Sequence, residues 1–199
     1  PFGHSGEKAI SSFFSEGEGN VLKSELSETE WNDVINFEGN ANSFRQLVHQ
    51  FAGRRPGGFA MTYSMLASIV KYPFSSKYAN EKGKFGFFTS EKDTYEKIAE
   101  ELGILKRGEE QYVRHPLVYL VEAADDICYQ VMDLEDAHKL KIVNTRETIE
   151  LMLGFFEGER KARIQKVMDN VVDKNEKVGY LRSCIIGTLV HECAEAFVN

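Results

Sequence analysis

Residues 117–137 read LVYLVEAADDICYQVMDLEDA, and this stretch decides the fold class. Apolar residues recur along it at helical spacing, and Pro116 stands immediately before it, a residue that is common at the first position of a helix. The pattern predicts a helix from Pro116 to about Leu140. The predicted core side of this helix carries Leu117, Leu120, Val121, Ala124, Ile127, Cys128 and Val131.

Two carboxylates and a phenol follow one another at intervals of four residues in the same helix, at Asp125, Tyr129 and Asp133. At about 3.6 residues per turn, this spacing places them on one stripe with a drift of roughly 40° per step. The three polar groups therefore face the same way. Taken alone, such a stripe is typical of a solvated acidic face on a surface helix.

Helical patterns continue on both sides of this segment, so the chain is predicted to be all-α. Ser27 stands three residues before Glu30, which indicates a capping box at the start of one helix. Pro73 predicts that another helix ends near Lys71 and Tyr72. The predicted helices cover residues 6–16, 26–37, 40–53, 61–72, 93–104, 116–140, 146–156, 162–173 and 182–199.

Two of these predictions depend on glycine. Phe44 and Phe51, seven residues apart, belong to one apolar face that is predicted to end at Gly53. Gly83 and Gly86 stand among Lys and Ser residues, which predicts a loop-rich insert over about residues 75–92 with at most a short extended piece. Loops of this length are uncommon unless they are functional or mobile. The RRPGG stretch that contains Arg54 and Arg55 is interpreted as a solvated loop.

Composition limits the classes of protein that remain. The 199 residues suffice for one large domain or two small ones, and we expect one helical domain over 1–199. The formal net charge of −7 argues against tight nonspecific binding to nucleic acid, so an anionic ligand must be met by a few placed cations. Three cysteines indicate a reducing, cytoplasmic setting, and no apolar run is long enough to span a membrane.

Several short motifs, in this order, carry a family resemblance. They are PFGHSGE (1–7), FEGNA (37–41), VKYP (70–73), KFGFF (84–88), RHPLVYLVEAADDICY (114–129) and DLEDA (133–137). Together they resemble the deoxyguanosine triphosphate triphosphohydrolase family of HD-domain phosphohydrolases, which implies an all-α, HD-domain-like helical bundle. In that family the first motif directly follows the His-Asp pair that names the superfamily. The chain therefore looks like an internal fragment whose N-terminal ligand helices are missing.

The resemblance implies roles for residues that match these motifs. Asp125 is similar to the last metal-binding carboxylate, and Tyr129 and Asp133 resemble the residues that receive the deoxyribose. Asn40, Lys71, Tyr72 and Lys84 resemble contacts to the triphosphate or the sugar. The metal implied is Mg or Mn, with Co, Fe, Ni or Zn as further candidates.

His4 and Glu7 resemble the catalytic pair of the family. Their spacing of three residues places them on one helical face, so the carboxylate can hold the imidazole in one tautomer and raise its basicity. The reaction implied is hydrolysis of dGTP, or another dNTP, at the α-phosphorus to a deoxynucleoside and tripolyphosphate. Because the His-Asp pair is expected before Pro1, the 199 residues alone are expected to bind metal poorly and to be inactive.

A second hypothesis comes from another class of protein. The chain could be a regulatory, oligomerising HD domain that binds nucleotides or single-stranded DNA without chemistry, since members of the family are commonly homo-oligomers and some respond to nucleotides. The residues immediately before Pro1 would discriminate between the two. A hydrolase of cyclic nucleotides or of (p)ppGpp is disfavoured by FEGNA and by the spacing of Tyr129 and Asp133.

Overall fold

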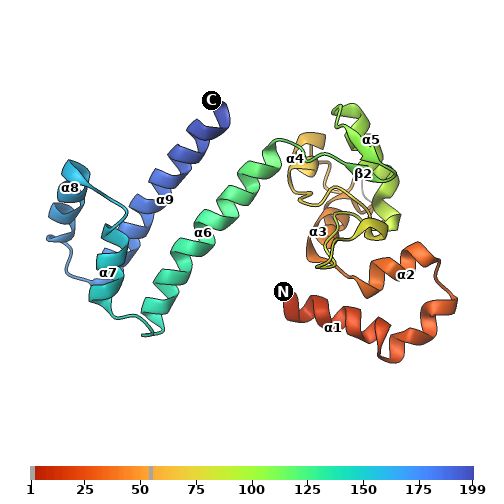
Figure 1. The fold of residues 1–199 in the computed structure, drawn as a ribbon, viewed down its shortest axis with the longest axis horizontal. Coiled ribbons are helices and arrows are strands. Elements are labelled where there is room, and N and C mark those ends of the chain that lie inside the picture. Colours follow the sequence, from red (N-terminus) through yellow and green to blue (C-terminus); the bar gives the residue numbers. More distant parts are fainter. Residues whose placement is uncertain (1–2, 54–55) are drawn as a thin grey trace. The chain divides into compact units, whose positions relative to one another are not determined.

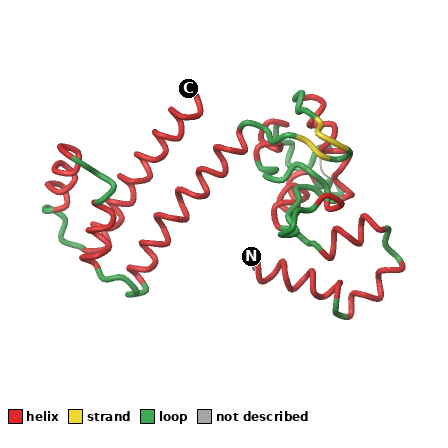
Figure 2. The backbone as a smooth tube through the Cα atoms, viewed as in Figure 1, coloured by secondary structure: helices red, strands yellow, loops and turns green. Residues whose placement is uncertain are grey.

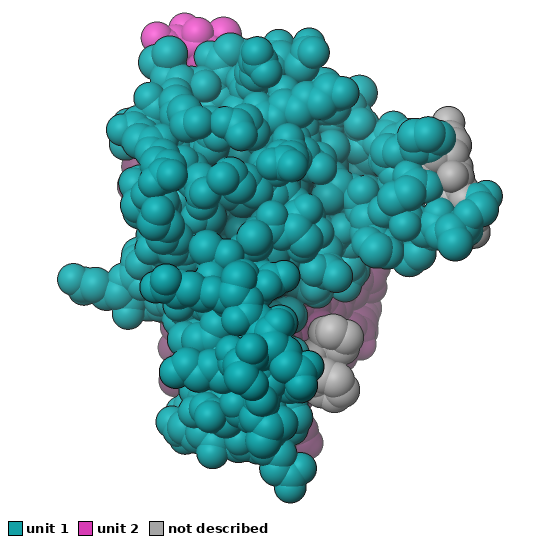
Figure 3. Space-filling model, turned by 90° about the vertical axis from the view of Figure 1, so that its right-hand side faces the viewer, with its two compact units in different colours: residues 1–119 teal, residues 120–199 magenta. Residues whose placement is uncertain are grey.

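The computed structural model describes residues 3–53 and 56–199, and the chain forms two compact units, residues 1–119 and 120–199 (Figures 1 and 3). The predicted all-α class is confirmed, because helices dominate both units (Figure 2). Arg54 and Arg55, interpreted above as a loop, lie outside the described residues. In the described part of the chain, no helix is both long and apolar enough to cross a membrane.

Unit 1 consists of short helices and one hairpin, and its last residues begin the long helix α6 (Leu117–Lys139). Its α-helices are α1 (Gly3–Ser15), α2 (Glu28–Ile35), α3 (Gly39–Val48), α4 (Tyr63–Ser68) and α5 (Lys92–Glu101). Three 3₁₀ helices lie between them, η1 (Glu18–Ser24), η2 (Ser76–Tyr78) and η3 (Thr89–Glu91). The two strands of the hairpin are β1 (Lys106–Gly108) and β2 (Gln111–Tyr112).

The core of unit 1 is built around Tyr95 of α5, which is fully buried. Phe87 stacks on its ring at 4.7 Å between centroids, and Phe44 of α3 and Tyr112 of β2 meet it edge-on. Such aromatic pairs add to the free energy gained from buried apolar area. A second cluster contains Phe85 and Phe88 with Ala41.

Residues 75–92 are tied into this core, although they contain little regular structure. The phenylalanines of KFGFF are all buried, Phe87 in the cluster around Tyr95 and the other two in the second cluster. The short extended piece expected at this motif is present, because Ser75 and Phe87 form a parallel bridge. The motif therefore serves as core structure as well as connecting loop.

The boundaries of two helices differ from the prediction. The capping box of Ser27 and Glu30 is confirmed at the start of α2. However, α3 ends at Val48, because His49 adopts an extended conformation with ψ of 129°, and Phe51 beyond it is 49% exposed. Helix α4 ends at Ser68 instead of near Tyr72, because the following backbone pairs with other segments, Phe74 with Gln111 and Ser75 with Phe87.

The hairpin of β1 and β2 has no counterpart in the sequence prediction. Its strands pair antiparallel with Lys106 opposite Tyr112, and Glu110 in the connection has a positive φ of 55°. Strands this short contain too few residues to display an alternating apolar pattern. They are held instead by contacts with distant segments, such as the hydrogen bond from the Tyr112 amide to the Pro73 carbonyl at 2.9 Å.

Unit 2 contains the rest of α6 with α7 (Thr145–Leu153), α8 (Gly158–Met168) and α9 (Lys174–Val198). The side chains of Asn144 and Asp173 cap α7 and α9. Helix α9 begins eight residues before the predicted start at Arg182, since the Asp173 cap lies further upstream. The core gathers residues of all four helices, Val131, Met152, Leu153, Phe156, Ile164, Met168, Val178, Leu181 and Ile185.

The buried side of α6 is partly different from the predicted one. Ile127 and Val131 are buried as predicted. Val118 is buried too, and Leu134 packs against the core of unit 2, although neither was assigned to the core side. The core assignment was wrong for four residues that are exposed, Leu117, Val121, Ala124 and Cys128. The physical reason is that α6 packs through a face turned away from them, which the apolar pattern alone did not distinguish.

Helix α6 is fixed to α9 by a buried carboxylate of the DLEDA motif. Glu135 is 8% exposed and accepts a short hydrogen bond from the Arg182 guanidinium, and Lys139 lies 2.9 Å from its other oxygen. Burial acts to raise the pKa of Glu135, but the hydrogen bonds and charges of Lys139 and Arg182 outweigh it and lower this pKa. We infer that Glu135 has a structural role in this motif.

Replacement of Gly86 tests how closely the VKYP and KFGFF motifs pack. A Cβ atom at this position would overlap the carbonyl oxygen of Tyr72 and lie 2.6 Å from Cγ1 of Val70. Gly86→Ala is expected to lower the free energy of unfolding by about 1–3 kcal/mol, as overpacked cores do. The measurement is thermal and urea-induced unfolding of the full-length protein.

Gly187→Ala is the control for this prediction. Gly187 lies within α9, and a Cβ atom there meets no other atom within 4 Å. Alanine should stabilise this helix by about 0.5–1 kcal/mol, because it restricts the unfolded chain more than glycine does. Equal stability of the two variants would contradict the close packing at Gly86.

Candidate functional site

Three of the sequence motifs meet at Lys84. Its ammonium nitrogen lies 2.7 Å from Oε1 of Glu38 and 3.3 Å from Oε2 of Glu7. The three residues come from KFGFF, FEGNA and PFGHSGE. Burial acts to lower the pKa of Lys84, but the hydrogen bonds and charges of Glu38 and Glu7 outweigh it, so this pKa is raised. We call these three residues the Lys84 clamp.

Glu38 is the most buried member of the clamp, at 1% exposure, and it also begins α3. Its Oε2 accepts hydrogen bonds from the backbone N–H groups of Asn40 at 2.6 Å and Ala41 at 3.2 Å. Its Oε1 accepts a third hydrogen bond, from the side-chain amide of Asn40 at 3.0 Å. A carboxylate at a helix N-terminus is stabilised by the helix dipole and by these donors. Glu38 therefore orients both Asn40 and Lys84.

Glu7 connects helix α1 to the Lys84 clamp and to the start of α3. Its Oε1 accepts a hydrogen bond from the backbone N–H of Gly39 at 3.0 Å, and a Cβ atom at position 39 would lie only 2.5 Å from this oxygen. The expected hydrogen bond between Glu7 and His4 is not formed. His4 is exposed, and it makes no hydrogen bond or ion pair with any residue that the structure describes.

A groove of about 430 Å³ lies beside the clamp. Three of the residues singled out in the sequence, His4, Glu7 and Lys84, line it together, and two further lysines, Lys8 and Lys82, line it as well. These two lysines were not predicted from the sequence, because both lie just outside the motifs with implied roles. The groove thus combines one imidazole with several cations and two carboxylates.

Lys71 and Tyr72 form a second group in unit 1. The Lys71 ammonium nitrogen is 5.9 Å from the centre of the Tyr72 ring, and Cζ of the Arg114 guanidinium is 6.0 Å from the same centre. Two cations therefore lie near one phenol ring, a geometry that favours cation–π attraction. Arg114 was quoted in the RHPLVY motif but given no role, and the motif itself was the only signal that could have drawn attention to it.

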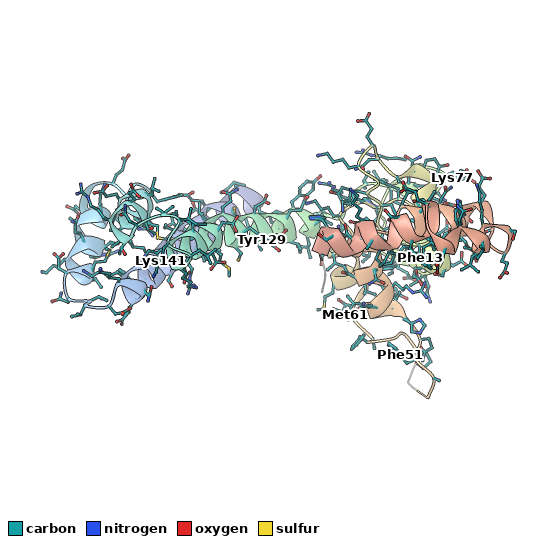
Figure 4. All side chains as sticks on the ribbon, turned by 90° about the horizontal axis from the view of Figure 1, so that it is seen from below. Phe13, Phe51, Met61, Lys77, Tyr129 and Lys141 are labelled. Carbon is teal, nitrogen blue, oxygen red and sulfur yellow. The ribbon has the colours of Figure 1, made fainter. Side chains whose placement is uncertain are left out.

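The other three predicted residues lie on α6 in unit 2. Asp125, Tyr129 and Asp133 are exposed, and Figure 4 shows Tyr129 on this helix. None of the three makes a hydrogen bond or ion pair within residues 3–53 and 56–199.

The described residues do not by themselves fit a metal ion. Among them, no group of three or more His, Cys, Asp or Glu side chains is arranged to hold one. Asp125 supplies a single exposed carboxylate, and divalent ions in proteins require several ligands.

Two further carboxylates of unit 1 are buried, although they were not predicted from the sequence. Asp33 accepts a hydrogen bond from the Thr89 amide at 2.8 Å, and Glu91 accepts one from the Ser90 hydroxyl at 2.9 Å. Each also has a buried oxygen without a hydrogen-bond partner among the described residues. Burial raises the pKa of both carboxyl groups, although their hydrogen bonds act to lower it. Nothing in the local sequence distinguishes them from surface carboxylates.

These contacts hold the end of the KFGFF segment against two helices. Asp33 lies on α2, whereas Thr89 and Glu91 belong to η3, directly after the motif. Arg45 of α3 donates a hydrogen bond to the Ser90 hydroxyl at 3.1 Å and lies 3.9 Å from the Glu91 carboxylate. The segment that carries Lys84 is therefore anchored to α2 and α3 directly after the motif.

Comparison with known proteins confirms the family resemblance. No family model matches the chain, but its full length aligns with curated relatives. It is 39% identical over 207 residues to a deoxyguanosinetriphosphate triphosphohydrolase-like protein of Pseudomonas aeruginosa, and 34% identical over 222 residues to one of Synechocystis. It is 29% identical over 257 residues to the deoxyguanosinetriphosphate triphosphohydrolase of Yersinia pseudotuberculosis. The chain spans 46–47% of the length of these relatives.

Removal of Glu38 tests whether the clamp stabilises the fold. Glu38→Ala takes away the closer partner of Lys84 together with the cap of α3. We expect the free energy of unfolding to fall by about 2–3 kcal/mol. This loss is smaller than that for breaking a fully buried ion pair, because Lys84 still has Glu7 as a partner. The measurement is urea-induced unfolding of the full-length protein.

The matched control is Glu109→Ala, which removes an exposed partner of a lysine. Glu109 lies 3.0 Å from Lys77, with both side chains largely in solvent. Exposed pairs contribute little to stability, so the unfolding midpoint of this variant should equal that of the wild type. A Glu38→Ala variant with a wild-type midpoint would show that the clamp does not support the fold.

The pH dependence of stability tests the environment of Asp33. Because its pKa is raised in the folded state, its stabilising contribution is present below about pH 4, the ordinary range of an aspartate, and is lost as the pH rises through the folded pKa. Asp33→Asn is neutral at every pH and keeps an oxygen for the Thr89 amide. The difference in melting temperature, variant minus wild type, should therefore rise between pH 4 and pH 8. A difference that stays constant over this range would contradict a raised pKa.

Proposed function

We propose that this chain, which is related in sequence to the deoxyguanosinetriphosphate triphosphohydrolase family, carries part of the active site of a dNTP triphosphohydrolase. The reaction proposed is hydrolysis of dGTP, or of another dNTP, at the α-phosphorus, which releases a deoxynucleoside and tripolyphosphate. The observation that supports it best is the groove beside the Lys84 clamp, where three motifs meet and His4 lies with several lysines.

His4 is proposed to handle the proton of the reaction. It is exposed on the groove, and an imidazole side chain can both give and take a proton. It would either deliver a proton to the 5′-oxygen as the deoxynucleoside leaves or accept one from the attacking water. Glu7, held by Gly39 and Lys84, would position α1 and therefore His4.

The cations of unit 1 are proposed to meet the triphosphate, which carries about four negative charges at neutral pH. Lys84 and Lys71 would contribute charge-assisted hydrogen bonds to phosphate oxygens. Asn40, oriented by Glu38, and Tyr72, flanked by Lys71 and Arg114, would contact the sugar or the phosphates. Such preorganised donors stabilise the charge that develops on the leaving group.

Tyr129 and Asp133 on α6 are proposed to receive the deoxyribose, with Asp133 accepting a hydrogen bond from the 3′-hydroxyl. Both side chains are exposed and therefore available for a ligand. A divalent metal, Mg or Mn foremost, is proposed for the whole protein with Asp125 among its ligands. Assembly as a homo-oligomer and binding of an effector nucleotide or single-stranded DNA are further proposals from the family resemblance.

Product analysis tests the proposed reaction. The full-length protein is incubated with dGTP and with each other dNTP in the presence of Mg or Mn, and tripolyphosphate is resolved from pyrophosphate and orthophosphate. Tripolyphosphate with free deoxynucleoside is the expected result. Pyrophosphate or orthophosphate as the first product would mean that another bond is cut, and no product with any dNTP would favour a role in binding alone.

His4→Ala should lower kcat by about 10²–10⁴-fold, the usual contribution of a general acid or base, while substrate affinity changes little. The matched control is His191→Ala, a variant of an exposed histidine on α9 that pairs with Glu195 at 3.2 Å. Turnover and affinity are measured by single-turnover kinetics and by binding of a non-hydrolysable nucleotide. A His4→Ala variant as active as His191→Ala would contradict the assignment.

A further inference from the structure

The turn that carries Lys84 also fixes the backbone of a second lysine, Lys82. The side-chain oxygen of Asn80 accepts hydrogen bonds from the backbone N–H groups of Lys82 and Lys84, both at 3.0 Å. The amide of Gly83 donates to the carbonyl of Asn80 at 2.8 Å. Gly83 has φ of +71°, which glycine adopts without steric cost. Lys82 and Lys84 are thus held by one ordered turn.

The two carboxylates of the clamp already compensate the charge of Lys84. Lys8 of α1 and Lys82 line the same groove, and neither makes an ion pair with a residue in the described ranges. Three lysines therefore face two carboxylates, which leaves one positive charge in excess, whereas the whole chain carries a net charge of −7. The groove is a local exception to the acidic character of the protein, and such exceptions attract anions.

We propose that Lys8 and Lys82 bind the β- and γ-phosphates of the nucleotide and then hold the tripolyphosphate that leaves. Lysine ammonium groups bind phosphate oxygens as mobile point charges, and both side chains are exposed enough to do so. His4 lines the same groove, which places the proton-transfer group close to where the leaving phosphates are held. The assignment to these phosphates rests on the proposed function, whereas the binding of a polyphosphate anion does not.

Inorganic tripolyphosphate is the probe that tests this inference. Isothermal titration calorimetry is performed on the full-length wild type, on Lys8→Ala and Lys82→Ala, and on the double variant. Each substitution should weaken binding by about fivefold, as expected for one solvent-exposed ion pair, and the double variant by about 25-fold. Binding to the double variant should also depend less on salt, because fewer charges are screened.

Lys97→Ala is the matched control, because Lys97 is an exposed lysine of α5 in the same unit that does not line this groove. It should bind tripolyphosphate as the wild type does. Lys8 and Lys82 are both exposed, so their variants should melt at the wild-type temperature. Lys82→Arg should restore most of the affinity that Lys82→Ala loses. Equal affinity of the double variant and Lys97→Ala would overturn the inference.

Kinetics separate the inference from the proposed function. If the wild type converts a dNTP to tripolyphosphate, the double variant should raise KM by about the same factor as the tripolyphosphate Kd, with kcat within about twofold. An unchanged KM in an active enzyme would overturn the inference and leave the proposed function standing. A protein that binds tripolyphosphate through Lys8 and Lys82 but hydrolyses no dNTP would support the groove and contradict the proposed function.

Discussion

The position of Lys84 between Glu7 and Glu38 is the constraint on which unit 1 depends. Burial of a carboxylate such as Glu38 is costly unless cations and N–H donors replace the water it has lost. Lys84 and the first amides of α3 supply them, and Glu7 then completes the shell of Lys84. Helix α1, helix α3 and the KFGFF segment are therefore held by one set of charges, and the loss of any member leaves the others incompletely paired.

The KFGFF motif links this constraint to the hydrophobic core. Lys84 points to the clamp, whereas Phe85 and Phe87 enter two different apolar clusters. Gly86 between them leaves space for the Tyr72 backbone, which brings VKYP alongside. The same five residues thus build the core and position the candidate site, so a displacement of one would displace the other.

Local patterns in the sequence predicted those features that depend on interactions between residues close together in the chain. The capping box at Ser27 and the helices over residues 117–139 and 3–15 followed from spacing, with boundaries within a few residues. The contact of Asp33 with Thr89, 56 residues apart, and that of Glu7 with Lys84, 77 residues apart, carry no local signal. The early end of α4 has the same origin, because long-range pairing of Phe74 and Ser75 replaced helical hydrogen bonds that the sequence allowed. The motifs singled out Glu7 and Lys84, but they did not indicate that Glu7 would turn toward Lys84 instead of His4.

The two units use opposite arrangements of buried charge. In unit 1 one lysine lies between two carboxylates, and in unit 2 the single carboxylate of Glu135 lies between Arg182 and Lys139. In buried ion pairs of this kind, the free-energy cost of removing the charges from water offsets most of their Coulomb attraction. They therefore hold side chains in position more than they attract ligands. The clamp of unit 1 is, in addition, negative overall. An anion approaching the groove is therefore attracted chiefly by Lys8 and Lys82, which lie outside the clamp, are exposed and make no ion pair with a carboxylate among the described residues.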